Sequence, residues 1–198
     1  MSGQSVRHTL RQQIRQRRQA IPLQAQQNAA NALLQRAKAT HVFSDAKHIA
    51  LYLVNDGEID PMPLIEWLWQ QGKSVYLPVV HPFSKGHLLF LHFDLNTPLV
   101  DNRFGIPEPQ LNVLHVKPAQ QLDLICTPLV AFDDRGHRLG MGGGFYDRTL
   151  AALPSTAKPQ VIGLAHDCQQ VEKLPEESWD VPLPAILTPA KYWQWDHH

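Results

Sequence analysis

The chain has 198 residues, of which 43% are hydrophobic, and this length and composition fit one domain with a sizeable core. Its 18 basic residues are matched by 18 acidic ones, so its overall charge favours neither nucleic acid nor an anionic membrane as a partner. Two cysteines, Cys126 and Cys168, are too few for a disulfide framework and are predicted to be buried thiols. We therefore expect one domain over residues 1–198, cytoplasmic and without a membrane span, as a monomer with an oligomer left open.

The chain begins with a helical periodicity. Val6, Leu10 and Ile14 recur every four residues and predict an amphipathic helix. An adjacent stripe of this helix carries four basic residues: Arg7, Arg11, Arg15 and Arg18. Taken alone, such a stripe is more often a solvated face than a binding surface. The same Arg-rich, acid-free composition occurs in organellar transit peptides, but the amphipathic helix already explains it.

Short apolar runs alternate with helical runs in the rest of the chain, after a second predicted helix over residues 24–37. Residues 49–54, 61–71 and 75–80 predict a strand, a helix and a strand, which is the βαβ unit of a parallel sheet. Further elements are predicted as strands at 88–93, 122–129, 161–165 and 185–187 and a short helix at 145–153. The strand at 88–93 is the candidate for an antiparallel addition. The pattern predicts a three-layer α/β sandwich with a mostly parallel, Rossmann-like sheet, whose ligands lie beyond the carboxyl ends of the strands.

The most informative stretch is residues 138–148, which read Arg-Leu-Gly-Met-Gly-Gly-Gly-Phe-Tyr-Asp-Arg. Glycine loses backbone entropy on folding and packs no side chain, so four glycines in five positions indicate positive φ angles or a ligand close to the main chain. Successive free N–H groups ahead of a helix can bind phosphate. The loop lacks the Gly-Lys-Ser/Thr ending of a P-loop and the spacing of the dinucleotide fingerprint, and a tight structural turn is the alternative.

Charged residues beside the glycines favour the phosphate interpretation. Arg138 and Arg148 can pair with phosphate oxygens, and Asp147 can hold Mg²⁺. Together these groups predict a site for a nucleoside triphosphate.

The run Gly-Met-Gly-Gly-Gly-Phe-Tyr-Asp-Arg at 140–148 closely resembles the signature loop of 5-formyltetrahydrofolate cyclo-ligases, also called methenyltetrahydrofolate synthetases. The Arg-rich first helix, Gly-Glu-Ile-Asp at 57–60, Gly-Ile-Pro-Glu-Pro at 105–109 and Pro-Leu-Val-Ala-Phe-Asp at 128–133 are similar to the same family. The resemblance covers about residues 7–195 and implies a ligase with a NagB/RpiA/CoA transferase-like fold. It also implies ATP and Mg²⁺, which the family uses to phosphorylate the formyl oxygen of 5-formyltetrahydrofolate before N10 closes the ring. ADP and phosphate are released, and 5,10-methenyltetrahydrofolate is the product.

The resemblance also implies roles for individual residues. The expected ATP-binding residues are Arg7, Arg11, Arg138, Gly140, Met141, Gly142, Gly143, Gly144, Phe145 and Tyr146. The expected folate-binding residues are Glu58, Phe104, Met141, Gly142, Gly143, Gly144 and Phe145. Asp147 and Asp180 are the expected metal ligands, and Arg148 and Asp147 the expected catalytic residues. The chain departs from the family at Arg7, where the family has Lys, and at Phe145, where it usually has Tyr.

Three alternatives to this assignment stay open. An enzyme of related architecture, such as a sugar-phosphate isomerase or a small-molecule kinase, could use the same loop for another phosphate. A nucleotide- or folate-binding regulatory protein would bind without turnover. The eleven histidines suggest a metal site only weakly, because no Cys/His set has zinc-site spacing. Four tryptophans are expected to serve in core and edge packing: Trp67, Trp69, Trp193 and Trp195.

Overall fold

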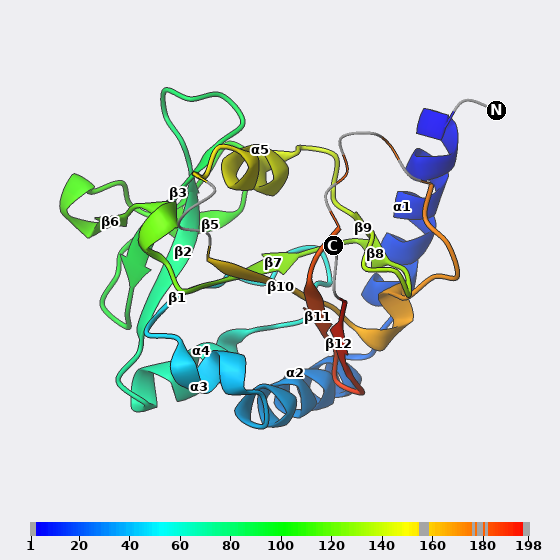
Figure 1. Ribbon diagram of the computed structural model, residues 1–198, viewed down its shortest axis with the longest axis horizontal. Helices are drawn as coiled ribbons and strands as arrows, with labels where there is room; N and C mark the ends of the chain where they lie inside the picture. The colour runs from blue at the N-terminus through cyan, green and yellow to red at the C-terminus, as the bar shows by residue number, and fades with distance from the viewer. Residues whose placement is uncertain (1–2, 155–158, 176, 178–179, 181, 196–198) are drawn as a thin grey trace.

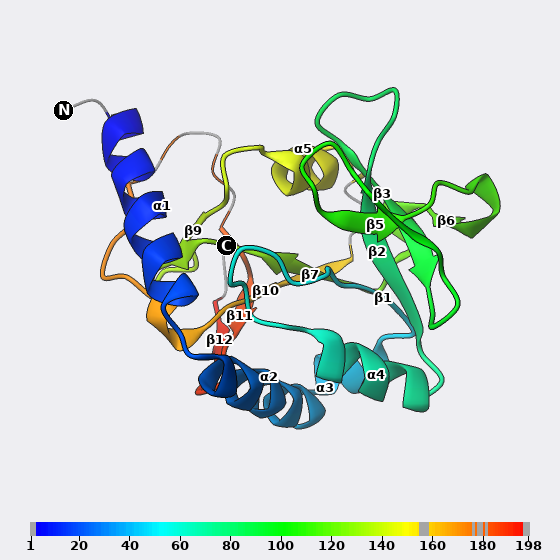
Figure 2. The ribbon, with the colours of Figure 1, turned by 180° about the vertical axis from the view of Figure 1, so that it is seen from behind.

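A mostly parallel sheet forms the centre of the molecule (Figures 1 and 2) in the computed structural model, which describes residues 3–154, 159–175, 177, 180 and 182–195. In spatial order, the strands of this sheet among the described residues are β12 (Tyr192–Gln194), β11 (Ala185–Leu187), β10 (Gln160–Leu164), β7 (Leu124–Pro128), β1 (His48–Ala50), β2 (Ser74–Val80), β3 (Leu88–Phe93) and β6 (Val116–Lys117). The strands from β11 to β2 run parallel. The outer strands β12, β3 and β6 each run antiparallel to the neighbour nearer the centre, so the antiparallel addition at 88–93 is confirmed.

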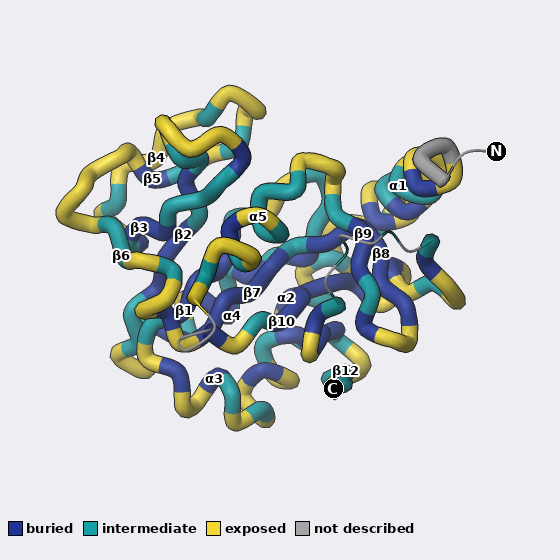
Figure 3. Tube along the Cα trace, turned by 45° about the horizontal axis from the view of Figure 1, so that its top comes forward, coloured by how far each residue is buried: buried dark blue, intermediate teal, exposed yellow. Residues whose placement is uncertain are grey.

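Helices cover both faces of this sheet. On one face lie α2 (Leu23–Lys38), α3 (His41–Asp45) and α4 (Met62–Gln70), and on the other lies α5 (Phe145–Ala151) (Figures 1 and 2). Neighbouring residues of β1 show the alternation: Ile49 packs in the cluster under α2 and α4, whereas Ala50 packs in the cluster under α5. Because helices cover both faces of the sheet, β11 is buried throughout and β7 is buried over its first four residues, as Figure 3 shows for β7. The predicted three-layer α/β fold is confirmed.

The remaining elements surround one end of the sheet. Helix α1 (Gly3–Gln19) lies beside the 3₁₀ helix η3 (Asp167–Gln169), and its fully buried Ile14 packs against Val130 and Leu139. Two short hairpins pair β4 (Leu99–Asp101) with β5 (Pro107–Pro109) and β8 (Ala131–Phe132) with β9 (Arg138–Leu139). Two further 3₁₀ helices are η1 (Val113–His115) and η2 (Ala119–Gln121).

The strand predicted at residues 49–54 is shorter in the structure. Its last ladder residue is Ala50, although the backbone N–H of Leu51 still donates to the carbonyl of Tyr76 at 2.9 Å. Beyond it the chain turns sharply, because Asp56 and Gly57 both have positive φ angles, of 52° and 72°. The turn lifts the following residues away from the sheet and toward the candidate site.

Two predictions about side chains had different outcomes. Cys126 is buried as expected, but Cys168 is exposed, because η3 places it on the surface. Trp193 and Trp195 stack with ring centroids 6.1 Å apart beside the sheet edge, which confirms their packing role. None of the helices in the described ranges has the length and hydrophobicity that a membrane span requires.

Candidate active site

Two cavities adjoin at the glycine-rich loop of residues 140–144. The larger, which we call the apolar cavity, has a volume of about 470 Å³ and lies beyond the carboxyl ends of β1, β2 and β7. The other, which we call the charged cavity, has a volume of about 400 Å³ and lies between this loop and α1. Both are lined by Arg138, Gly140, Gly144 and Asp147, so the loop is their common wall. The position matches the prediction that ligands lie beyond the carboxyl ends of the strands.

The glycines of the loop serve different purposes. Gly142 and Gly144 have φ angles of 97° and 63°, which L side chains rarely adopt. A Cβ atom on Gly143 would lie 2.8 Å from the ring of Phe145. At Gly140 φ is not positive and a Cβ would meet nothing within 4 Å. Because no internal reason requires glycine at Gly140, that position favours a ligand that approaches the main chain from a cavity.

The charged cavity has an excess of positive charge. Its lining includes Arg7, Arg11, Arg138 and Arg148 against Asp147 and Asp180. The Nε of Arg11 donates to the carbonyl of Gly140 at 2.8 Å, and no carboxylate of the described residues forms an ion pair with Arg11. Burial and the neighbouring charge of Arg7 lower the pKa of Arg11. A cation held next to another cation is suited to binding an anion.

Arg7 and Arg18 show that the basic stripe of α1 is not a solvated face. They are 9% and 0% exposed. Arg7 forms a two-pronged ion pair with Asp180, in which Nη2 donates to Oδ1 at 2.9 Å, and its Nη1 also donates to the carbonyl of Pro175 at 3.0 Å. The simple interpretation of the stripe as a solvated face is therefore wrong for these two residues. The helical periodicity could not reveal this, because the covering residues come from distant parts of the sequence.

Each carboxylate in the charged cavity is bound by an arginine. Asp147 is paired with Arg138 and Asp180 with Arg7. Burial would raise the pKa of Asp180, but the hydrogen bonds from Arg7 and from the backbone N–H of Glu177 outweigh it and lower that pKa. Asp147 and Asp180 both offer the carboxylate oxygens that Mg²⁺ prefers. No cluster of three or more His, Cys, Asp or Glu side chains occurs in the part of the chain that the structure describes, so a metal here would need phosphate oxygens or water as further ligands.

Arg148 joins the loop to the hairpin between β2 and β3. Its Nε donates to the carbonyl of Gly86 at 3.1 Å, and its Nη2 donates to the carbonyl of Gly143. The guanidinium also lies 5.9 Å from the ring centroid of Phe145. The side chain is exposed and lines the charged cavity, so its free N–H groups can reach an anion there.

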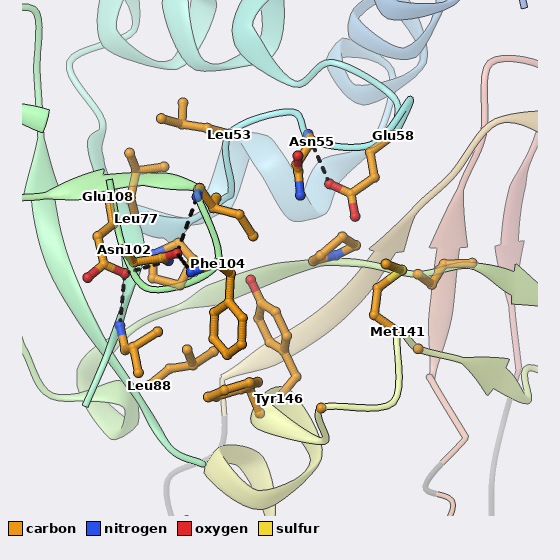
Figure 4. Close-up of a pocket in the computed structure, with 18 of the residues that line it drawn as sticks. Leu53, Asn55, Glu58, Leu77, Leu88, Asn102, Phe104, Glu108, Met141 and Tyr146 are labelled. Carbon is orange, nitrogen blue, oxygen red and sulfur yellow. Dashed lines mark hydrogen bonds between the residues drawn. The ribbon is translucent and has the colours of Figure 1, made fainter. Parts of the chain in front are cut away.

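Aromatic and aliphatic side chains wall the apolar cavity (Figure 4). The rings of Phe104 and Phe145 meet edge to face, with centroids 5.8 Å apart and an interplanar angle of 82°. Phe104 and Met141 are 54% and 50% exposed, which leaves apolar surface available to a ligand. An aromatic pair and a methionine beside a cavity are suited to a flat heterocycle.

Glu58 is the carboxylate that the turn after β1 brings to the apolar cavity. Burial raises its pKa to about 7, although the charge of Arg18 and the hydrogen bond that Oε2 accepts from Asn55 N at 3.3 Å favour the ionised form. No ion pair involves Glu58 within the described ranges. The ionisable groups that act on Glu58 or lie against it are Arg18 of α1, Asp56 of the same turn, Tyr52, Tyr146 and His166. Glu58 can therefore accept hydrogen bonds from a ligand as pH rises through neutrality.

Asn102 and Glu108 of this cavity were not expected as site residues from the sequence, whereas Tyr146 was expected to bind a ligand. The hydroxyl of Tyr146 is buried without a hydrogen-bond partner and points into the cavity (Figure 4). Glu108 accepts hydrogen bonds from Asn102 Nδ2 at 3.0 Å and from Val80 N at 3.1 Å, so these residues fix the β4–β5 hairpin beside the cavity. Their spacing in the sequence carries no such signal, because the hairpin and the strand that it meets lie far apart along the chain.

The structure divides the expected ligand-binding residues between the two cavities. Those lining only the charged cavity are Arg7, Arg11, Gly142, Arg148 and Asp180. Those lining only the apolar cavity are Glu58, Phe104, Met141, Gly143, Phe145 and Tyr146. Gly142, expected at both ligands, lines only the charged cavity, where a Cβ would lie 3.7 Å from Arg11. Met141, Phe145 and Tyr146, expected at ATP, line only the apolar cavity, and these ligand assignments stay predictions.

Comparisons with known proteins agree on one family. The model of the 5-formyltetrahydrofolate cyclo-ligase family matches residues 3–189. The chain is 53% identical over 182 residues to the 5-formyltetrahydrofolate cyclo-ligase of Escherichia coli (strain K12), which covers 92% of this chain and all of that protein. It is 51% identical over 181 residues to the protein of the same name from Haemophilus influenzae, covering 91% of this chain and 96% of that one.

Solved structures share the fold. The NMR structure of Aquifex aeolicus 5,10-methenyltetrahydrofolate synthetase superimposes with a TM-score of 0.82 at 27% identity, covering 98% of this chain and 97% of that one. A 5,10-methenyltetrahydrofolate synthetase from Mycoplasma pneumoniae gives a TM-score of 0.72 at 25% identity, over 92% and 98% of the two chains.

Proposed function

This chain belongs to the 5-formyltetrahydrofolate cyclo-ligase family, and from that premise we propose that it converts 5-formyltetrahydrofolate into 5,10-methenyltetrahydrofolate in an ATP- and Mg²⁺-dependent reaction. The names of its relatives support the reaction. The observation that carries the assignment of ligands is the pair of adjoining cavities with opposite chemistry, which share the glycine-rich loop. An enzyme that transfers a phosphoryl group between two substrates needs such an arrangement.

The charged cavity is the proposed site of the triphosphate. Its excess of arginines matches an anion, and Arg11 and Arg148 have no carboxylate partner among the described residues. The main chain at Gly140 and Gly142 borders the same cavity and leaves room for phosphate oxygens. The γ-phosphate would then lie near the shared wall.

The apolar cavity is the proposed site of the folate. Phe104, Phe145 and Met141 provide faces for the pteridine ring, and Glu58 is placed to accept hydrogen bonds from its N–H groups. The unpartnered hydroxyl of Tyr146 offers one further hydrogen bond to the substrate. With the folate on this side of the loop, its formyl group can face the phosphate across Gly140 and Gly144.

The reaction then needs alignment more than covalent help from the protein. The formyl oxygen attacks the γ-phosphorus, and the bond to the bridging oxygen of ADP breaks. N10 attacks the activated carbon and loses its proton to solvent, and the former formyl oxygen leaves with the phosphate. Arg138 and Arg148 would neutralise the charge that develops on the transferred group.

Asp147 and Asp180 are the residues that would hold Mg²⁺. Both line the charged cavity and both are paired with arginines, which fits a cation that arrives with a triphosphate. When bound, the ion would screen the charge of the phosphate oxygens. The arginines would then exchange part of their pairing from carboxylate to phosphate.

Turnover of the purified protein tests this proposal. Mixing it with 5-formyltetrahydrofolate and Mg-ATP should raise the near-ultraviolet absorbance of the methenyl product, with one ADP and one phosphate released per turnover. Product formed without ATP, or with a nonhydrolysable analogue, would contradict the mechanism. Ligand binding without turnover would instead support a regulatory binding protein, and turnover of a sugar phosphate would support an enzyme of related architecture. A cytoplasmic location, a monomeric state and the lack of nucleic-acid or membrane partners stay predictions.

A further inference from the structure

Three side chains of α1 hold Asp56, in the turn after β1. Arg15 Nε and Arg18 Nη2 each donate to Oδ2 of Asp56 at 2.6 Å, and Gln19 donates to Oδ1. The Nε of Arg18 also donates to the backbone carbonyl of Asp56, at 2.8 Å. Asp56 has a φ of 52°, which is uncommon for a residue other than glycine. An Asp-Gly pair adopts such a turn readily, and the hydrogen bonds anchor this turn to α1.

Arg18 differs from Arg15 in what else it contacts. Arg15 is 41% exposed, whereas the side chain of Arg18 is fully buried. Besides Asp56, Arg18 donates to the carbonyl of Leu129 at 3.3 Å and contacts the sulfur of Met141 at 3.9 Å. These partners belong to the end of β7 and to the glycine-rich loop, and both line the apolar cavity. One rigid guanidinium thus connects three parts of the cavity wall.

Glu58 lies two residues after Asp56, on the same turn. Gly57 between them has a φ of 72°, and a Cβ there would lie 3.3 Å from the backbone of Gln19, so the turn packs directly on the end of α1. The direction of the Glu58 carboxylate therefore depends on how the turn is held.

We propose that Arg18 is a positioning residue: through Asp56 it fixes the turn against β7 and the glycine-rich loop, and so directs the carboxylate of Glu58 at the folate. This inference rests on the proposed role of Glu58 in folate binding. Helix α1 then links the two cavities. Its Arg7 and Arg11 line the charged cavity, and its Arg18 lies behind the wall of the apolar cavity.

A double-mutant cycle separates positioning from simple packing. Arg18→Lys keeps the charge but loses the forked donors, and we expect it to raise the KM for 5-formyltetrahydrofolate about tenfold. Glu58→Gln alone should raise this KM by roughly 10- to 100-fold. If Arg18 acts through Glu58, the double variant should have the same KM for 5-formyltetrahydrofolate as Glu58→Gln alone. Once the Glu58 carboxylate is gone, Arg18→Lys can no longer misplace it. The KM for ATP should change less than about twofold in Arg18→Lys.

Arg15→Gln is the matched control. Like Arg18→Lys it removes hydrogen bonds to Asp56, but the hydrogen bonds to Leu129 and Met141 belong to Arg18 and stay in place. Its KM for folate should stay within about twofold of wild type. Asp56→Asn gives an independent test from the other partner and should reproduce the Arg18→Lys pattern, including its disappearance in the Glu58→Gln background. If Arg18→Lys does not fold, the Asp56→Asn variant tests the positioning role by itself.

Each outcome has one meaning. Additive effects of Arg18→Lys or Asp56→Asn with Glu58→Gln, or equal losses for folate and ATP, would overturn the positioning role while leaving the proposed function intact. A wild-type protein that neither binds nor converts 5-formyltetrahydrofolate would overturn the proposed function itself. A Glu58→Gln variant with normal folate KM would show that Glu58 has no role for Arg18 to support.

Discussion

The charged cavity and the apolar cavity share one wall but hold their carboxylates in opposite ways. Asp147 and Asp180 are bound by arginines, and the pKa of Asp180 is lowered. Glu58 has no ion pair within the described residues, and burial raises its pKa to about 7. One side of the loop therefore keeps fixed charges for a strongly anionic ligand, and the other keeps a titratable acceptor for a largely neutral ring. A carboxylate can serve both purposes because its neighbours differ: arginines bind it in the charged cavity, and burial dominates in the apolar cavity.

Asp147 tests the charged side of this comparison and should give the largest effect. Asp147→Asn keeps the size of the side chain but removes the charge that would hold Mg²⁺. We expect kcat to fall by roughly 10²-fold or more, with partial recovery at high Mg²⁺ or Mn²⁺. Steady-state kinetics against metal concentration measure this. Asp45→Asn, at an exposed position of α3 that lines neither cavity, should leave kcat unchanged.

A folded Asp147→Asn protein with normal kcat and an unchanged metal response would remove Asp147 from the metal site. Asp180 would then be the remaining carboxylate of that cavity.

Glu58 tests the apolar side through pH. Its ionised form is the better acceptor, so kcat/KM for the folate should rise as pH increases through about 7. Glu58→Gln should lower kcat/KM by roughly 10- to 100-fold at pH 8 and remove this rise. A pH profile of kcat/KM for wild type and variant measures both. An unchanged rise near pH 7 in the variant would mean that another group titrates there.

Arg7 and Arg11 lie on the same helix face but differ in their partners. Replacing either with alanine should raise the KM for ATP by about tenfold and leave that for folate nearly unchanged. Arg7→Ala should also lower the free energy of unfolding by about 1–3 kcal/mol, because Asp180 loses its partner in a partly buried place. Arg11→Ala should have little effect on stability, since the Arg11 side chain donates its hydrogen bond to a single carbonyl, that of Gly140. ATP saturation curves and thermal melts distinguish the two, and equal melting temperatures would contradict the difference.

The contributions of Glu58 and Asp56, two carboxylates of the turn after β1, to the stability of the fold should respond to pH with opposite sign. The pKa of Glu58 is raised from 4.5 to about 7, so its burial destabilises the fold progressively as pH rises from 4.5 through 7. Asp56, whose pKa is lowered to about 2 mainly by its hydrogen bond with Arg15, stabilises the fold above pH 3.8 and loses that effect as pH falls through 2.

At pH 8, Glu58→Gln should therefore be more stable than wild type, by up to about 3.5 kcal/mol for a rise from 4.5 to about 7 at about 1.4 kcal/mol per pKa unit. At pH 4 the two proteins should unfold alike. Denaturant melts at both values measure this, and an equal difference at pH 4 and pH 8 would contradict the assigned pKa.

Local patterns predicted the sheet and the loop, but not the contacts behind them. Runs such as the one that forms β7 are apolar throughout because both faces are covered, so the parallel core was visible in the sequence. The partners of Arg18 lie 38 residues away at Asp56 and 111 away at Leu129, and no periodicity reports such distances. An Asp-Gly pair such as that at 56–57 favours a turn, but nothing in the local sequence indicates that this turn is attached to α1. The hairpin of Asn102 and Glu108 stayed unpredicted for the same reason.

Equilibrium binding to Glu58→Gln and Arg11→Ala tests most directly whether the loop separates a folate cavity from a triphosphate cavity. Isothermal titration calorimetry with 5-formyltetrahydrofolate and, separately, with a nonhydrolysable ATP analogue and Mg²⁺ gives four dissociation constants. We predict a crossed pattern, in which Glu58→Gln weakens only the folate and Arg11→Ala weakens only the nucleotide, each by about tenfold or more. If each variant weakens both ligands alike, or the pattern is reversed, the division of the site between the two cavities is wrong.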